Sequence, residues 1–318
     1  MPKILVITPV KHIPGVQELL ESAGDVEYYD NPTLNEVLGI IPKYNVIFTN
    51  PNKSNVFIGR DLIDAGKNLR AICTASTGLN HIDIQYAKSK GITVISLTTE
   101  IDVITKISST AEHAFALMFA ALRHIPQAFE SVKSGEWDYT KYIGRQMDFL
   151  TVGVVGYGRL GTKFAAYARA FGCKVLVYDP YKTVERTDIY QVGLDQLLQD
   201  SDIISLHVHV TTETKNMVNS SWFSIVKPTV ILVNTSRGDV IVEKDAINFL
   251  RTHPDSCLAV DVIADEVQSK KQNLFIDYSK KQDNLIITPH IGGMTVEGQM
   301  IAYSHAAKLL KNFLEKGD

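Results

Sequence analysis

Strand-like and helical runs alternate along nearly the whole chain, and this alternation restricts the fold more than any other feature. Five apolar, β-branched runs in the first hundred residues predict strands at Lys3–Thr8, Val26–Tyr29, Asn45–Thr49, Ala71–Thr74 and Thr93–Leu97. Six more are predicted at Thr151–Val155, Lys174–Tyr178, Asp202–His207, Thr229–Asn234, Leu258–Val262 and Leu285–Thr288. Helical patterns separate most of these runs, which predicts parallel sheets covered by helices on both faces.

The length of 318 residues suits two domains. We expect an α/β protein with two Rossmann-like or flavodoxin-like parallel-sheet domains, the larger of them a doubly wound nucleotide-binding domain. A long helix, expected at Thr110–Arg123 with Ser109 or Thr110 as its cap, lies between the two series of strands. An amphipathic helix at Thr295–Glu315 is expected to return to the first domain. The predicted domains are therefore residues 1–105 plus 294–318, and residues 106–293.

Composition and charge exclude several classes of partner. The net charge is −3 and no basic block occurs, which argues against nucleic acid or an anionic membrane surface as a partner. No apolar run approaches the roughly 18 residues that a membrane span needs. Cys73, Cys173 and Cys257 lack metal-ligand spacing and are expected to be reduced core residues of a cytoplasmic protein. His207 and His209 share a strand face, but without a third ligand we expect no metal site.

A glycine-rich loop follows the strand Thr151–Val155. It reads Gly156-Tyr157-Gly158-Arg159-Leu160-Gly161 and leads into a helix, the arrangement that holds a dinucleotide pyrophosphate at a helix N-terminus. The next strand ends beside Asp179, where an acidic residue is expected to contact the adenosine ribose and to repel the 2′-phosphate of NADP. The loop and Asp179 therefore predict NAD as the cofactor. The alternative is that Asp179 only caps the turn at Pro180.

Three polar residues follow the carboxyl ends of later strands. Arg237, Glu266 and His290 are all expected at the sheet edge from which the glycine loop leaves. Oxidising an alcohol to a ketone removes a hydride from carbon and a proton from oxygen, and a histidine is a suitable base for that proton. Glu266 would hold the second ring nitrogen, and Arg237 would bind a substrate carboxylate through two parallel hydrogen bonds. Each residue alone would be unremarkable in a turn, but their joint placement predicts a dehydrogenase site, with His207 bordering the cofactor.

At these residues the chain resembles the D-isomer-specific 2-hydroxyacid dehydrogenases, which include D-3-phosphoglycerate dehydrogenase. The resemblance covers essentially the whole chain and rests on the glycine loop with Asp179 and on three later motifs. These motifs are Asn234-Thr235-Ser236-Arg237-Gly238-Asp239, Ala259-Val260-Asp261-Val262 leading to Glu266, and Thr288-Pro289-His290-Ile291-Gly292-Gly293. Three departures are Val267 and His209, at two places where the family usually has proline, and extra residues at Thr98–Lys106.

The resemblance implies a function for each motif. It makes Arg237 the carboxylate anchor, His290 the acid/base and Glu266 its partner. The residues it implies around NAD, beyond the glycine loop and Asp179, are Val208, Thr235, Ser236, Asp261, Gly292 and Gly293. The loop Ser76-Thr77-Gly78 is expected to bind the substrate carboxylate, which makes residues 1–105 plus 294–318 the substrate-binding domain. The expected partners are a small 2-hydroxy or 2-keto acid and a second copy of the chain in a homodimer.

Two classes of function remain open from the sequence. One is an NAD-dependent enzyme that interconverts a D-2-hydroxy acid and its 2-keto acid. The other is a non-enzymatic NADH-sensing protein of the corepressor type, because those proteins share the fold and the same three residues. For the enzyme we expect the two domains to close on the substrate, with Gly292 and Gly293 absorbing the backbone rotation.

Overall fold

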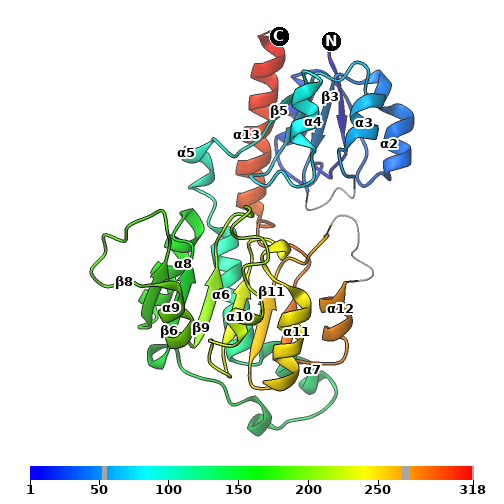
Figure 1. Ribbon diagram of the computed structural model, residues 1–318. Coiled ribbons are helices and arrows are strands. Elements are labelled where there is room, and N and C mark those ends of the chain that lie inside the picture. Colours follow the sequence, from blue (N-terminus) through cyan, green and yellow to red (C-terminus); the bar gives the residue numbers. More distant parts are fainter. Residues whose placement is uncertain (52–55, 267–272, 317–318) are drawn as a thin grey trace. The chain divides into compact units, whose positions relative to one another are not determined.

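The computed structural model describes residues 1–51, 56–266 and 273–316, which form two compact units (Figure 1). The first unit comprises Met1–Ile107 with Gly293–Asp318, and the second comprises Ser108–Gly292. Both boundaries lie within two residues of those expected from the sequence. Each unit contains one parallel sheet, so the predicted α/β class with two parallel-sheet domains is confirmed.

The first unit is built on a five-stranded parallel sheet in the order β2-β1-β3-β4-β5. Its strands are β1 (Lys3–Val6), β2 (Asp25–Tyr28), β3 (Val46–Thr49), β4 (Ala71–Thr74) and β5 (Thr93–Ile95). The helices are α1 (Val16–Glu21), α2 (Leu34–Ile40), α3 (Arg60–Ala65), α4 (Ile84–Ser89), α5 (Ile101–Ile104) and α13 (Val296–Glu315), with the 3-10 turn η1 (Ile41–Lys43). Helix α13 begins after the capping residue Thr295, and its buried Tyr303, Ala306 and Leu310 pack in the same core as Ile4 and Val6.

The second unit is built on a seven-stranded parallel sheet in the order β12-β11-β10-β9-β6-β7-β8. Its strands are β6 (Thr151–Val155), β7 (Lys174–Tyr178), β8 (Tyr190–Gln191), β9 (Ile203–Leu206), β10 (Ile231–Asn234), β11 (Cys257–Val260) and β12 (Leu285–Ile287). Its helices are α6 (Ser109–Leu122), α7 (Ile125–Lys133), α8 (Arg159–Ala170), α9 (Leu194–Asp200), α10 (Ser220–Phe223), α11 (Glu243–Thr252) and α12 (Leu274–Ser279). Short 3-10 turns are η2 (Tyr139–Tyr142), η3 (Met147–Phe149) and η4 (Gly238–Val240).

The central strands of the second sheet are continuous apolar runs because helices bury both of their faces. All four residues of β9 and of β10 are buried. On one face, Leu117 of α6 and Phe164 of α8 belong to a core with Val152. On the other face, Leu197 of α9 and Phe249 of α11 pack in a second core, so two layers of helix enclose the sheet.

Three local predictions were wrong. Strand β8 was not predicted, because two exposed residues at a sheet edge leave no apolar run. Helix α8 begins at Arg159, inside the glycine loop rather than after Gly161, because the extended residue Gly158 leads directly into it. Helix α6 is preceded by Ser108 rather than by a cap at Ser109 or Thr110, and the Ser108 hydroxyl donates to Glu112 at 2.5 Å.

No helix within the described ranges is both long and apolar enough to cross a membrane.

Candidate active site

The glycine loop leaves the second sheet where the strand order reverses direction. Strand β6 lies between β7 and β9, so the chain proceeds toward one edge through β7 and toward the other through β9 and β10. In an open parallel sheet this reversal leaves a crevice beyond the carboxyl ends of the two central strands. The loops after β6, β7, β9, β10, β11 and β12, which carry the expected site residues, all leave the sheet at that edge.

The loop has the backbone geometry of a phosphate-binding turn. Gly156 has φ +90°, and a Cβ there would overlap the carbonyl oxygen of His207. Gly161 packs against the Gly156 carbonyl in the same way, so the loop and α8 approach too closely for any larger residue. Space is open around the Cα of Gly158, and Arg159 and Leu160 form the first turn of α8, whose amides point out of the helix N-terminus.

Asp179 ties the glycine loop to the end of β7. Its Oδ2 accepts the amide of Tyr157 at 2.7 Å, and its Oδ1 accepts the amides of Tyr181 and Lys182 at 2.9 and 3.1 Å. A carboxylate has about four acceptor positions, so these bonds do not exhaust it. Asp179 therefore caps the turn, the alternative raised by the sequence, and also lies beside the loop.

His207 and Val208 form a wall against the glycine loop. The His207 ring packs on Phe164 at 5.1 Å between centroids and lies 2.9 Å from the Ser205 hydroxyl through Nε2. Burial lowers the pKa of the His207 imidazole to about 3, so the ring is neutral at ordinary pH. A neutral ring beside the loop adds no charge to the dinucleotide crevice.

The turn after β10 holds Arg237 through a buried asparagine. The side chain of Asn234 accepts the amide and hydroxyl of Ser236 at 3.0 and 2.6 Å and donates to the Arg237 carbonyl at 2.9 Å. Burial lowers the pKa of Arg237, while the nearby carboxylates of Glu266 and Asp239 raise it. The guanidinium is thus kept charged in a partly desolvated place, where it binds an anion more strongly than at the surface.

His290 and Glu266 are in direct contact. His290 Nδ1 lies 2.7 Å from Glu266 Oε1, and the side chains are 17% and 20% exposed. A carboxylate accepts only, so Nδ1 carries the proton and Nε2 is the nitrogen whose protonation changes during acid/base chemistry. His290 has φ 56°, in the left-handed region, and its amide donates to the Asp261 carbonyl at 2.9 Å. Val267, the expected departure in this loop, lies outside the described residues.

Asp261 faces the loop that carries His290. Its carboxylate, nearly inaccessible to solvent, accepts the amides of Ile291 and Gly292 at 2.8 and 2.7 Å and the hydroxyl of Thr288 at 2.5 Å. Burial acts to raise the pKa of Asp261, but these bonds and one from His113 outweigh it and keep the pKa below its usual value. Asp261 is therefore an ionised group at the centre of the loop.

The residues of this edge fit a dinucleotide. The hydroxyl oxygen of Thr235 is buried without a hydrogen-bond partner among the described residues. A buried polar atom of this kind is available to form a hydrogen bond with a ligand. The open space at Gly158 and the amides of α8 suit a pyrophosphate. Gly292 ends the second unit and Gly293 begins the returning segment of the first.

The expected substrate loop lies in the first unit, after β4. The Ser76 hydroxyl donates to the Gly78 carbonyl at 2.8 Å, and the Thr98 hydroxyl donates to the Thr77 carbonyl at 3.1 Å. The extra segment Thr98–Lys106 therefore begins against this loop. It contains α5, and Glu100 before that helix contacts His305 of α13 at 2.6 Å.

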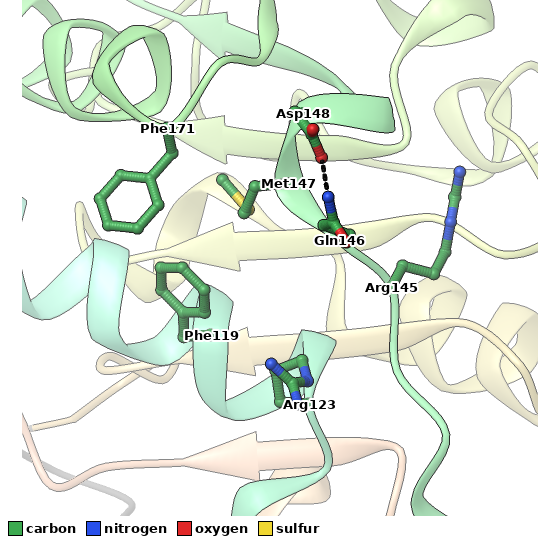
Figure 2. A pocket seen from close by; sticks show the side chains of 7 residues that line it. All are labelled: Phe119, Arg123, Arg145, Gln146, Met147, Asp148 and Phe171. Carbon is green, nitrogen blue, oxygen red and sulfur yellow. Dashed lines mark hydrogen bonds between the residues drawn. The ribbon is translucent and has the colours of Figure 1, made fainter.

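One pocket of the second unit lies away from the residues of this edge. It has a volume of about 310 Å³ and is lined by Phe119, Arg123, Arg145, Gln146, Met147, Asp148 and Phe171 (Figure 2). The rings of Phe119 and Phe171 lie 5.4 Å apart, and Gln146 donates to Asp148. No group of three or more His, Cys, Asp or Glu in the described ranges is arranged to hold a metal.

Sequence reasoning missed three side chains that support the site. His113 of α6 contacts Asp261 and Thr288, Asn234 shapes the Arg237 turn, and Glu243 accepts the amide of Ala264 in the loop before Glu266. Asn234 was within a quoted motif. His113 lies on a helix far from the motifs in sequence, whereas Glu243 follows the Asn234–Asp239 motif by four residues at the start of α11. Nothing local distinguishes either from other polar helical residues.

Comparison with known proteins shows the family of this chain. Residues 115–292 match the model of the family described as D-isomer specific 2-hydroxyacid dehydrogenase, NAD binding domain. The chain is 33% identical over 319 residues to D-3-phosphoglycerate dehydrogenase of Synechocystis sp., covering 99% of this chain and 54% of that protein. It is 36% identical over 269 residues to hydroxypyruvate reductase of Thermotoga maritima, covering 83% of each.

Among solved structures, D-lactate dehydrogenase of Aquifex aeolicus, complexed with NAD and lactic acid, is 30% identical with a TM-score of 0.81. The comparison covers 99% of this chain and 96% of that one. The chain spans about half the length of the phosphoglycerate dehydrogenases it matches. The family match, the glycine loop and the sheet reversal lead to one conclusion: the chain belongs to the D-isomer specific 2-hydroxyacid dehydrogenases and carries their NAD-binding domain.

Proposed function

We propose that this protein is an NAD-dependent oxidoreductase that interconverts a small D-2-hydroxy acid and its 2-keto acid. The observation that carries the proposal is the 2.7 Å contact between His290 and Glu266, in the loops beyond β12 and β11 at the edge where the glycine loop leaves β6. The named relatives reduce or oxidise acids of this class, among them phosphoglycerate, hydroxypyruvate and lactate.

His290 is proposed as the acid/base. In oxidation, Nε2 of His290 accepts the hydroxyl proton of the substrate as the C2 hydride leaves, and in reduction it returns that proton to the carbonyl oxygen. Bound NAD supplies the hydride acceptor and NADH the donor. Glu266 holds the ring in one tautomer and stabilises the imidazolium that forms.

Arg237 is proposed to bind the substrate carboxylate with two parallel hydrogen bonds. The Asn234 turn fixes its backbone, and partial burial strengthens the attraction. Ser76, Thr77 and Gly78 of the first unit are proposed as further carboxylate ligands.

The cofactor is proposed to lie along the crevice of the second unit. Gly156, Gly158, Arg159, Leu160 and Gly161 would hold the pyrophosphate, and Asp179, His207 and Val208 would border the adenosine half. The residues proposed for the nicotinamide half are Thr235, Ser236, Asp261, Gly292 and Gly293.

We further propose a homodimer. Helix α7 buries none of its residues, and the segment after it exposes large apolar side chains, including Trp137 at 90%, Tyr139 and Ile143. Exposed apolar surface of this extent is typical of an interface, and an isologous contact between two copies would cover it. Light scattering should report a dimer, and Trp137→Ser with Phe129→Ser should yield a monomer.

The cytoplasm is the proposed location. Cys73, Cys173 and Cys257 are free thiols, and Cys73 and Cys173 are buried. Secreted proteins of oxidising compartments more often pair their cysteines.

The decisive experiment is a panel of 2-keto acids, including phosphohydroxypyruvate, hydroxypyruvate, glyoxylate and pyruvate, assayed by loss of NADH absorbance. We expect turnover with at least one member. NADH binding by calorimetry without turnover on any member would favour the sensing protein instead.

A further inference from the structure

His113 of α6 reaches the loop that carries His290. Its Nε2 lies 2.9 Å from the Thr288 hydroxyl and 3.2 Å from Asp261 Oδ1. The His113 side chain is 18% exposed and that of Asp261 is 1% exposed. All three residues belong to the second unit, so this geometry lies within one unit of the fold.

The direction of each hydrogen bond follows from the donors present. The Thr288 hydroxyl donates its single proton to Asp261 Oδ1 at 2.5 Å, so its oxygen can only accept from His113. The Asp261 carboxylate also only accepts. His113 Nε2 must therefore carry a proton and donate toward both groups.

The same carboxylate holds the chain on the far side of His290. Asp261 accepts the amides of Ile291 and Gly292, and its carbonyl accepts the amide of His290 itself. We call His113, Thr288, Asp261 and the amides of Ile291 and Gly292 the Asp261 clamp.

We propose that His113 is a positioning residue that, through the Asp261 clamp, holds His290 in the geometry that its acid/base role requires. This inference rests on the proposed function. It assigns to a helix residue, remote in sequence from the site motifs, control over the pose of the reacting imidazole.

The backbone of His290 explains why a clamp is needed. At φ 56° a residue with a side chain is strained, by roughly 1–2 kcal/mol, and returns to a favoured conformation unless its neighbours are held. Such a relaxation would carry the ring away from Glu266 Oε1, because the side chain follows the Cα–Cβ direction. A displacement of about 1 Å at a reacting group is enough to slow a reaction by on the order of 100-fold.

The clamp also joins the two places where the chain crosses between units. His113 lies in the helix that begins just after the chain enters the second unit at Ser108, and Gly292 is the last residue before it leaves. A Cβ on Gly292 would lie 3.3 Å from Thr110 Cγ2 and 3.0 Å from Asp261 Oδ2, so the two crossing segments are packed side by side. His290 is thereby fixed against both.

The test compares His113→Leu, His113→Gln and the control His253→Leu. Leucine removes the donor, whereas the glutamine amide places a donor near the position of Nε2. His253 caps α11 in the same unit through bonds to Phe249 and Thr252, away from the clamp. Amide hydrogen exchange, kcat and KM are measured on each purified protein.

We expect the amides of Ile291 and Gly292 to exchange about tenfold faster in His113→Leu, the loss of one net hydrogen bond. The kcat of His113→Leu should fall by on the order of tenfold with KM nearly unchanged. His113→Gln should restore most of the amide protection and most of the kcat. His253→Leu should change neither, even if it lowers the melting temperature.

The outcomes separate the two proposals. Unchanged exchange and unchanged kcat in His113→Leu would overturn the clamp and leave the proposed function standing. Equal losses in His113→Gln and His113→Leu would also overturn it, because the donor at Nε2 would then be irrelevant. Faster exchange in a protein that reduces no keto acid would support the clamp and overturn the proposed function.

Discussion

Gly238 packs against the backbone of Ile263, and a Cβ at Gly238 would overlap the carbonyl group of Ile263 and the amide nitrogen of Ala264. The loop that carries Arg237 and the loop that leads to Glu266 therefore touch main chain to main chain. If Arg237 and Glu266 have the roles proposed for them, the spacing between these two side chains should depend on this contact.

Gly238→Ala is expected to push the two loops apart. We expect a loss of unfolding free energy of roughly 1–3 kcal/mol and a fall in kcat that exceeds the change in NADH affinity. Gly193→Ala is the matched control, because Gly193 is in the same unit with open space around it. An alanine variant as active and as stable as the wild type would show that the contact is not limiting.

His290→Ala should lower turnover by on the order of 10²–10⁴-fold, the usual contribution of a positioned general acid or base. NADH should still bind, since the side chain pairs with Glu266 rather than with the glycine loop. Glu266→Gln should retain the contact with Nδ1 but lose the charge that stabilises the imidazolium. Its kcat should therefore lie between those of the wild type and His290→Ala. Stopped-flow turnover and fluorescence titration of NADH measure these effects, and full activity in His290→Ala would refute the acid/base role.

Arg237→Lys should raise the KM for the keto acid strongly, because lysine keeps a charge but not the planar two-pronged geometry. The Kd for NADH should change little. Arg251→Lys on the exposed face of α11 is the control. Equal weakening of cofactor and substrate would mean that Arg237 contacts the dinucleotide instead.

Asp179→Ala should narrow the preference for NADH over NADPH, because the carboxylate that repels a 2′-phosphate is removed. The substitution should also weaken the binding of NADH itself, since Asp179 anchors the Tyr157 amide of the glycine loop. Calorimetric Kd values for both cofactors distinguish these effects, with Asp195→Ala as a control for loss of charge elsewhere in the unit. A wild type that binds both cofactors equally would contradict the role of Asp179.

Acidification should destabilise the fold through His207. The folded pKa of about 3 lies below the ordinary value, so between roughly pH 6.5 and pH 3 the unfolded chain binds a proton that the folded chain does not. Stability from this group is therefore complete above pH 6.5 and declines as pH falls, by about 1.4 kcal/mol per pH unit. Urea unfolding at pH 7 and pH 5 gives the free energy of unfolding at each pH. From pH 7 to pH 5 this free energy should fall less in His207→Gln than in the wild type. Parallel losses in the two proteins would exclude His207 as the cause.

The sequence alone was sufficient for the sheets, because buried parallel strands must be continuous apolar runs and the helices between them must be amphipathic. Eleven of the twelve strands found in the described part of the chain were predicted, and the exception was the two exposed residues of β8. The glycine loop was likewise predictable from the sequence. The positive φ at Gly156 and the tight packing of Gly161 both require glycine, so the loop has a recognisable local sequence. The pairing of His290 with Glu266 was expected from their places after two strands.

What only the tertiary structure decided is how the site is held. His113 lies 175 residues before Thr288 in the chain, and Glu243 is separated by 21 residues from the Ala264 amide that it accepts. Their side chains look like ordinary polar helical residues until the sheet brings α6 and α11 against the loops beyond β11 and β12. Hydrogen-bond direction and burial depend on distances between segments that are remote in sequence. Local sequence patterns therefore predict which side chains react, whereas the contacts that orient those side chains exist only once the sheet and its two layers of helices have assembled.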